Sequence, residues 1–122
     1  MKLTLKKCIN ALSTNATQDE NRMREIWDDK CVFTDPLTKT ESLDKFIKHI
    51  QFYKIFGSFE KISISKCTVS KNVAISKGCL NYRLNMGFFK PNINIDFVTY
   101  MEFKNDKVIR HDDYWGNIRL GT

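Results

Sequence analysis

Two short segments of the chain combine side chains that could carry acid–base chemistry. The segment VIRHDDYWGN, residues 108–117, alternates as a strand does. Successive side chains of a strand point to opposite faces, so His111, Asp113 and Trp115 share one face. That face carries an imidazole, a carboxylate and an indole. The neighbouring Asp112 is expected on the opposite, exposed face.

The second segment is FTDP, in which Asp35 precedes Pro36 at the end of a short strand. A carboxylate in an apolar cavity has a pKa raised toward the range useful for proton transfer, and a histidine titrates near neutrality. Asp35, His111 and Asp113 facing one cavity could therefore activate a water or move a proton beside a carbonyl. Two alternatives stay open: Asp35 caps a turn, or His111 and Asp113 form a satisfied polar pair without a reaction.

Aromatic residues near these segments could supply the apolar walls of a pocket for a small hydrophobic ligand, namely Trp27, Phe33 and Trp115. Each has another interpretation. Trp27 on a helix stripe is more often part of the core, and Trp115 could seal an interface between two copies of the chain.

The elements that must position these residues follow from the hydrophobic periodicity. Helices are expected at 2–12, from a Thr17–Glu20 capping box to about residue 27, and from 43 to Gly57. Strands are expected at 31–36, 60–70, 73–88, 93–103 and 108–115, with turns at 71–72, 90–92 and 104–107. The prediction is an α+β fold in which N-terminal helices pack in a curved, mixed or antiparallel sheet that forms a cone.

Composition restricts the class of protein. The 122 residues suit one domain, 1–122, with its own core. The formal net charge of +6 is spread along the chain without an aromatic base-stacking motif, so a nucleic-acid partner is not expected. No apolar run approaches a signal peptide or a membrane span, which predicts a cytoplasmic protein with no membrane partner.

Neither a metal nor a cofactor is expected. The four cysteines lie far apart among apolar residues and are predicted to be buried, reduced thiols: Cys8, Cys31, Cys67 and Cys79. Their spacing does not match a metal site, and the chain has no glycine-rich phosphate loop.

FTDP and the later segment FVTYMEFKNDKVIRHDDYWG together resemble the nuclear transport factor 2-like superfamily, in its SnoaL-like branch. The resemblance covers the chain from the second helix to about Gly116. It implies a cone-shaped α+β barrel, and homodimers through the outer sheet face are common in this superfamily. Its members include isomerases, dehydratases, cyclases, epoxide hydrolases and adaptors without activity.

Similarity to ketosteroid isomerase places Asp35 at the position of the catalytic base. Thr99 falls where that enzyme has an oxyanion-hole acid, and is expected in the ligand pocket. Ala11 falls near its catalytic tyrosine. Both proton donors are therefore replaced, and steroid isomerisation is not expected.

Similarity to limonene-epoxide hydrolase instead places Asp113 at a catalytic acid. The R-x-D pair of that enzyme corresponds to Arg83 and Asn85, so Arg83 is implied as an electrostatic partner of Asp113.

Two hypotheses result. In the first, the protein binds a small, mostly apolar molecule and acts as a cofactor-independent isomerase, cyclase or hydrolase. Asp35 would be the base, Asp113 the acid, and His111 a proton relay or an orienting residue. In the second, it is a homodimeric binding or adaptor module whose cone is occluded. An open cavity with Asp113 at its floor would favour the first hypothesis.

Overall fold

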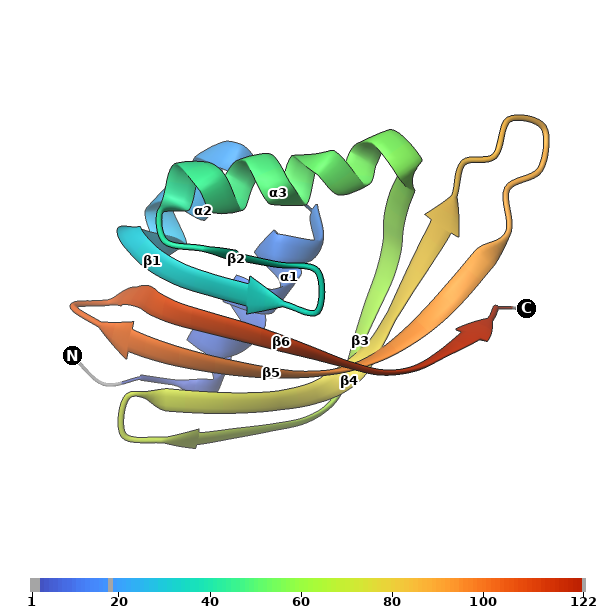
Figure 1. Ribbon diagram of the computed structural model, residues 1–122. Coiled ribbons are helices and arrows are strands. Elements are labelled where there is room, and N and C mark those ends of the chain that lie inside the picture. Colours follow the sequence, from blue (N-terminus) through green and yellow to red (C-terminus); the bar gives the residue numbers. More distant parts are fainter. Residues whose placement is uncertain (1–2, 18, 122) are drawn as a thin grey trace.

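Three helices and six strands make up the computed structural model, which describes residues 3–17 and 19–121, without the side chains of 16 and 17. Their order is α1 (Leu5–Thr17), α2 (Glu20–Ile26), β1 (Trp27–Asp35), β2 (Thr38–Thr40), α3 (Leu43–Phe56), β3 (Gly57–Ser70), β4 (Val73–Leu84), β5 (Asn92–Lys104) and β6 (Lys107–Leu120). The strands form one sheet in the order β2-β1-β6-β5-β4-β3. β1 and β6 are parallel, and the other neighbours are antiparallel (Figure 1).

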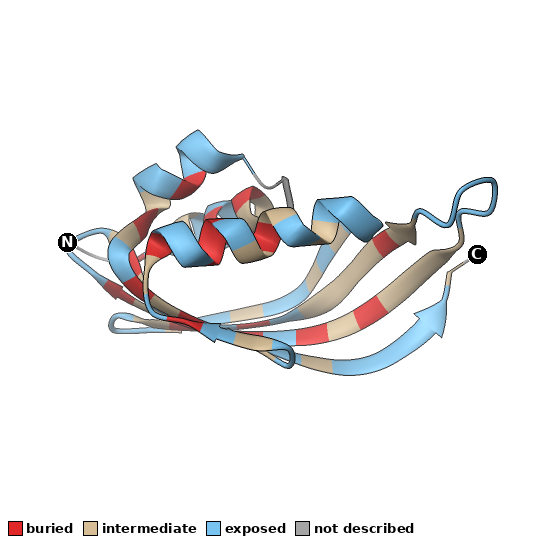
Figure 2. Ribbon diagram, turned by 45° about the horizontal axis from the view of Figure 1, so that its top comes forward, coloured by how far each residue is buried: buried red, intermediate tan, exposed pale blue. Residues whose placement is uncertain are grey.

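The helices lie against the concave side of the strongly curved sheet (Figure 1). Buried residues, red in Figure 2, gather where the helices face the strands. Alternation along β5 and β6 turns every second residue toward the helices. The largest of the fully buried side chains are Trp27, Phe33, Phe46 and Met23. The predicted α+β cone is confirmed.

The sequence misplaced the junction between the second helix and the first strand. Strand β1 begins at Trp27, which the periodicity assigned to the helix. Helix α1 continues to Thr17, and the N-cap of α2 is Asp19, whose side chain accepts a hydrogen bond from the backbone N–H of Arg22. The Thr17–Glu20 capping box was therefore wrong, because helical periodicity does not end at a polar residue that can continue the helix.

Three other boundaries also differ. Residues 38–40 form the short strand β2, which pairs with the end of β1. β4 ends at Leu84, so the turn that joins it to β5 lies at Gly87–Phe88 and not at 90–92. β6 continues five residues beyond the predicted end at Trp115, to Leu120. The turns at 71–72 and 105–106 fall where the sequence predicts them.

The cysteines are all free, but only two are fully buried. Cys8 and Cys31 have no exposed surface, whereas Cys67 and Cys79 are half-buried. Burial, together with the neighbouring Cys67, raises the pKa of Cys8 to about 12. Burial, together with the charge of Asp28, raises the pKa of Cys31 to about 12.

This difference predicts selective alkylation. Because the thiolate is the reactive form, iodoacetamide at mildly alkaline pH should leave Cys8 and Cys31 unmodified in the native protein. Mass spectrometry of the native and the urea-denatured protein measures this, and all four thiols should react after denaturation. Rapid native modification of Cys31 would contradict the burial described here.

None of the helices in residues 3–17 and 19–121 is long and apolar enough to cross a membrane.

Candidate functional site

A cavity lies between the inner face of the sheet and helices α1 and α3. Its volume is about 60 Å³. This is enough room for a few water molecules or a very small organic group. Its polar lining residues are Asn15, Asp35, Tyr53, Thr99 and Asp113. The remaining lining is apolar: Leu12, Phe33, Ile50, Phe59, Ile62, Leu80, Ile95, Phe97 and Trp115.

Asp113 is held in this cavity by two donors that meet at one of its oxygens. Thr99 lies directly opposite it on β5, and the Thr99 hydroxyl donates to Asp113 Oδ1 at 2.6 Å. His111, two residues earlier on the same face of β6, has its Nε2 at 2.8 Å from the same oxygen. Within the described part of the chain, no hydrogen bond reaches Oδ2. The second oxygen of the carboxylate therefore stays available to a ligand.

His111 is completely buried, and its hydrogen bonds fix its protonation. The Trp27 indole N–H donates to His111 Nδ1 at 3.3 Å. An indole nitrogen can only donate, so Nδ1 must be the unprotonated nitrogen and Nε2 carries the proton. The rings of Phe33 and Phe46 enclose the imidazole, with centroids at 5.2 and 5.7 Å. His111 is thus a neutral donor to Asp113.

Asp35 forms a second polar cluster on the cavity wall, and its two oxygens have different partners. Oδ1 accepts the backbone N–H groups of Leu37 and Thr38 at 2.8 and 2.9 Å, which is the turn-capping alternative raised by the sequence. Oδ2 lies 2.8 Å from His49 Nε2 and accepts the Tyr53 hydroxyl at 2.9 Å. The side chain of Asp35 is only 2% exposed.

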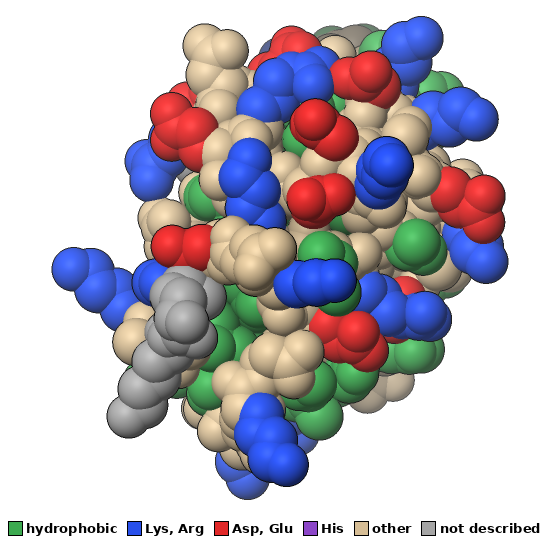
Figure 3. Space-filling view, turned by 90° about the vertical axis from the view of Figure 1, so that its left-hand side faces the viewer, with side chains coloured by type: hydrophobic (Ala, Val, Ile, Leu, Met, Phe, Trp, Pro, Cys, Tyr) green, Lys and Arg blue, Asp and Glu red, His purple; other side chains and the backbone are tan. Residues whose placement is uncertain are grey.

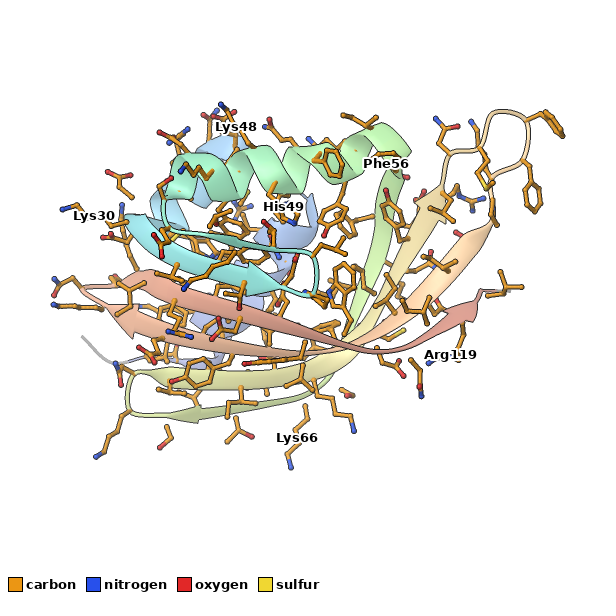
Figure 4. All side chains as sticks on the ribbon, viewed as in Figure 1. Lys30, Lys48, His49, Phe56, Lys66 and Arg119 are labelled. Atoms are coloured by element: carbon orange, nitrogen blue, oxygen red, sulfur yellow. The ribbon has the colours of Figure 1, made fainter. Side chains whose placement is uncertain are left out.

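Neither His49 nor Tyr53 was predicted from the sequence to be a site residue. They stand four residues apart on α3, which places both on one face of the helix. Figure 4 shows His49 on the side of α3 that faces β1 and β2. Burial and the hydrogen bond to Asp35 raise the pKa of Tyr53 well above its usual range. The hydroxyl therefore stays protonated, and it donates this one proton to Asp35 Oδ2.

Three of the predicted site residues do not line the cavity. His111 is fully buried and reaches it only through its hydrogen bond to Asp113. Trp27 is a fully buried core residue that touches the site only through its hydrogen bond to His111. Arg83 lies on the outside of the sheet, 3.5 Å from Glu60, and donates to the backbone carbonyl of Lys90. The expected pairing of Arg83 with Asp113 is therefore not formed, because that position on β4 faces away from the cavity.

Asp112 was expected to be exposed, and this was wrong. It does point to the outer face, but it is only 3% exposed. The Thr34 hydroxyl donates to it at 2.5 Å, and Arg110 Nε donates at 2.8 Å. Neighbouring side chains on β1 and β6 therefore cover a carboxylate that strand parity alone places in solvent.

The arrangement combines two carboxylates, each hydrogen-bonded to a histidine, with mostly apolar walls. The Asp113 cluster and the Asp35 cluster lie next to each other in the cavity wall. The ring centroids of Tyr53 and Trp115 are 6.2 Å apart, and the charge of Asp113 contributes to the raised pKa of Tyr53. Such a site can accept a proton at one point and donate one at another. Among the described residues, no three His, Cys, Asp or Glu side chains are grouped as metal ligands would be.

Comparison with known proteins relates the chain to others through structure alone. No family model matches the sequence, and no curated protein matches it. The chain is similar to a structure from Shewanella putrefaciens that is described as a SnoaL-like polyketide cyclase. The two superpose with a TM-score of 0.79 at 12% identity, and the match covers 90% of this chain and 87% of that one. A limonene-epoxide-hydrolase-like epoxide hydrolase from M. tuberculosis has a TM-score of 0.76 at 9% identity, with coverages of 92% and 81%.

A third structure is a Catenulispora acidiphila protein with a ketosteroid isomerase-like fold, in complex with trimethylamine. It has a TM-score of 0.79 at 7% identity and covers 93% of this chain and 88% of that one. These similarities show that the chain shares the fold of these three proteins over most of its length. The cone-shaped α+β fold implied by the sequence motifs is therefore the fold observed.

Proposed function

We propose that the cavity binds a small, mostly apolar molecule and performs cofactor-independent acid–base chemistry on it, with Asp113 as the base and not, as the sequence suggested, the acid. The observation that carries this proposal is the asymmetry of the Asp113 carboxylate. Oδ1 is fixed by Thr99 and His111, while Oδ2 has no partner within the described residues and belongs to a cavity-lining side chain. A base needs one oriented, unoccupied oxygen within reach of the proton that it takes.

His111 then acts as a positioning residue and not as a proton relay. Its Nε2–H orients Asp113, but its other nitrogen is closed off by the Trp27 indole N–H. Because that indole cannot accept a proton, no proton can leave the imidazole on that side.

The cluster of Asp35, His49 and Tyr53 supplies the donor. The hydroxyl of Tyr53 donates a hydrogen bond to Oδ2 of Asp35. His49 Nε2 lies within hydrogen-bond distance of both groups. The raised pKa of Tyr53 keeps its proton in place. The structure uses that one proton on Asp35, so the hydroxyl would stabilise a developing negative charge on a ligand oxygen by exchanging Asp35 for the ligand. The backbone N–H groups at Oδ1 and His49 at Oδ2 would still hold the carboxylate.

The reaction class proposed is isomerisation, cyclisation or hydrolysis. Neighbours with this fold are described as a polyketide cyclase, a protein with a ketosteroid isomerase-like fold and an epoxide hydrolase, which supports the class without choosing within it. The trimethylamine complex supports a small ligand, as does the limited room in the cavity.

The alternative is a homodimeric binding module without catalysis. The narrow cavity favours it, and so do the exposed side chains of Ile75, Val98 and Tyr114 on the outer face of the sheet. That face is the proposed dimer contact. Location in the cytoplasm likewise stays a prediction from the sequence.

Thermal-shift measurements with small epoxides, lactones, cyclic ketones and ketide fragments test ligand binding. A compound that binds only the folded cavity raises the unfolding temperature in proportion to the logarithm of its concentration. Ile95→Trp would fill the cavity and should abolish the shift, whereas Ile75→Trp, on the exposed outer face, should leave it unchanged. Equal shifts in both variants would exclude the cavity as the binding site.

A further inference from the structure

One end of the molecule exposes an unusual number of large apolar side chains. They come from the last turns of α3 and from the loop between β4 and β5. We call them the apolar tip: Phe52, Ile55, Phe56, Met86, Phe88 and Phe89. Figure 1 shows that the end of α3 and this loop lie at the same end of the molecule, and Figure 2 shows both as exposed. Monomeric proteins rarely expose apolar patches of this kind without a binding role.

The two parts of the tip are joined and well formed. The backbone N–H of Asn85 donates to the carbonyl of Phe56 at 2.7 Å, which ties the loop to the end of α3. Within the loop, Met86 N–H donates to the Phe89 carbonyl at 3.1 Å, across a turn in which Gly87 has φ +80°. Phe88, at the apex of this turn, has a fully exposed side chain. The tip is therefore presented by hydrogen-bonded backbone, which lowers the entropy lost when it inserts into another phase.

Most of the charged residues at the tip are basic. Residues 52–59 and 83–90 contain Lys54, Arg83 and Lys90 and no Asp or Glu, and Glu60 follows directly after the first of these segments. Of these, only Arg83 lies within 4 Å of a carboxylate, that of Glu60, among the described residues. The opposite end of the molecule, seen in Figure 3, instead mixes acidic and basic side chains.

We propose that the apolar tip docks on an anionic membrane surface, with Phe88 and Phe89 entering the interface and the surrounding lysines contacting lipid headgroups. Aromatic side chains combined with cations are what such surfaces bind. A second copy of the chain fits less well, because a symmetric contact would bring Lys54 and Lys90 of the two copies together, while the neighbouring carboxylate of Glu60 is already paired with Arg83. The sequence led us to expect no membrane partner, but that expectation rested on the lack of a spanning segment.

The apolar tip lies next to the cavity, so docking through the tip would affect access of a ligand to the cavity. Tyr53 and Phe59, which line the cavity, are sequence neighbours of the tip residues in α3. A docked molecule would therefore hold its cavity beside the lipid, where an apolar ligand is concentrated.

Co-sedimentation of the full chain with vesicles tests the proposal. The vesicles contain phosphatidylcholine alone or phosphatidylcholine mixed with phosphatidylglycerol. We expect the wild type to sediment with the mixed vesicles, and at least about tenfold less with phosphatidylcholine alone or at high salt. F88S/F89S and K54E/K90E should each lose at least about tenfold in affinity. Ile75→Ser and Lys66→Glu, exposed residues away from the tip, are the matched controls and should bind as the wild type does.

Circular dichroism and the unfolding temperature test whether each variant is folded. We expect F88S/F89S to fold, because the side chain of Phe88 is fully exposed and does not pack in the core. The proposal is overturned if the wild type does not sediment with the mixed vesicles, or if the tip variants sediment as well as the controls. Self-association in sedimentation equilibrium that F88S/F89S abolishes, without vesicle binding, would assign the tip to a second copy instead.

Discussion

Replacing Asp113 by Asn is expected to lower turnover by about 10²–10⁴-fold, the range typical of removing a general base. The amide oxygen can still accept the hydrogen bonds of Thr99 and His111, so the side chain keeps its position. What is lost is the basic oxygen, because an amide nitrogen cannot take up a proton at neutral pH. Asp113→Asn thus separates the chemical role of this residue from its structural one. The quantity to measure is kcat/KM for an epoxide, lactone or ketone that the wild type converts.

Asp96→Asn is the matched control for this variant. Asp96 is an exposed carboxylate on β5 that is paired with Arg119, outside the cavity. We expect its kcat/KM to equal that of the wild type, with an unfolding temperature close to it, since exposed ion pairs contribute little to stability. If Asp113→Asn converts the same compound as fast as Asp96→Asn does, Asp113 is not the base.

Replacing Trp27 by Ala is expected to cost about 3–5 kcal/mol of unfolding free energy, as for other buried aromatic residues. Trp27 has no exposed surface, and its ring packs against Phe46 at 5.6 Å and His111 at 5.9 Å. The substitution would leave a large cavity and would also remove the indole N–H from His111 Nδ1. Urea unfolding followed by circular dichroism measures the loss.

Trp27→Phe separates these two contributions. It keeps most of the ring volume but leaves His111 Nδ1 buried without its donor, at a cost of about 1–3 kcal/mol for the unsatisfied group. Leu37→Ala is the control, because Leu37 is 65% exposed and its loss should be nearly neutral. A cost below about 1 kcal/mol for Trp27→Ala would contradict the tight packing of this core.

The alternation of side chains between the two faces of a strand was the strongest guide to the site. The alternation of residues 108–115 placed His111, Asp113 and Trp115 on one face, and β6 does turn all three inward, with Asp113 and Trp115 in the cavity wall. This works because side-chain direction in a strand is a local property of the backbone. The order of helices and strands was predictable for the same reason, except for the three-residue strand β2, which was missed.

The partners of Asp35 could not be read in this way. His49 and Tyr53 belong to a helix, and only the packing of α3 on β1 brings them to that carboxylate. A polar pair at i and i+4 within an apolar stripe was the available signal. Arg83 failed for a related reason: the family pattern fixed its place in the sequence but not the face of β4 that it occupies. Asp112 was misjudged because parity says nothing about the side chains of Thr34 and Arg110 that cover it.

The central claim is that the cavity, and no other surface, receives the small molecule. Methyl-labelled NMR spectra of the isoleucines and leucines test it directly, during titration with the epoxide, lactone, ketone and ketide compounds. Methyl groups of Ile50, Ile62, Leu80 and Ile95 line the cavity, whereas those of Ile55 and Ile75 are exposed outside it. We predict saturable shifts confined to the cavity methyl groups for at least one compound. Shifts confined to Ile55 and Ile75, or cavity methyl groups that no compound moves, would contradict the proposed site.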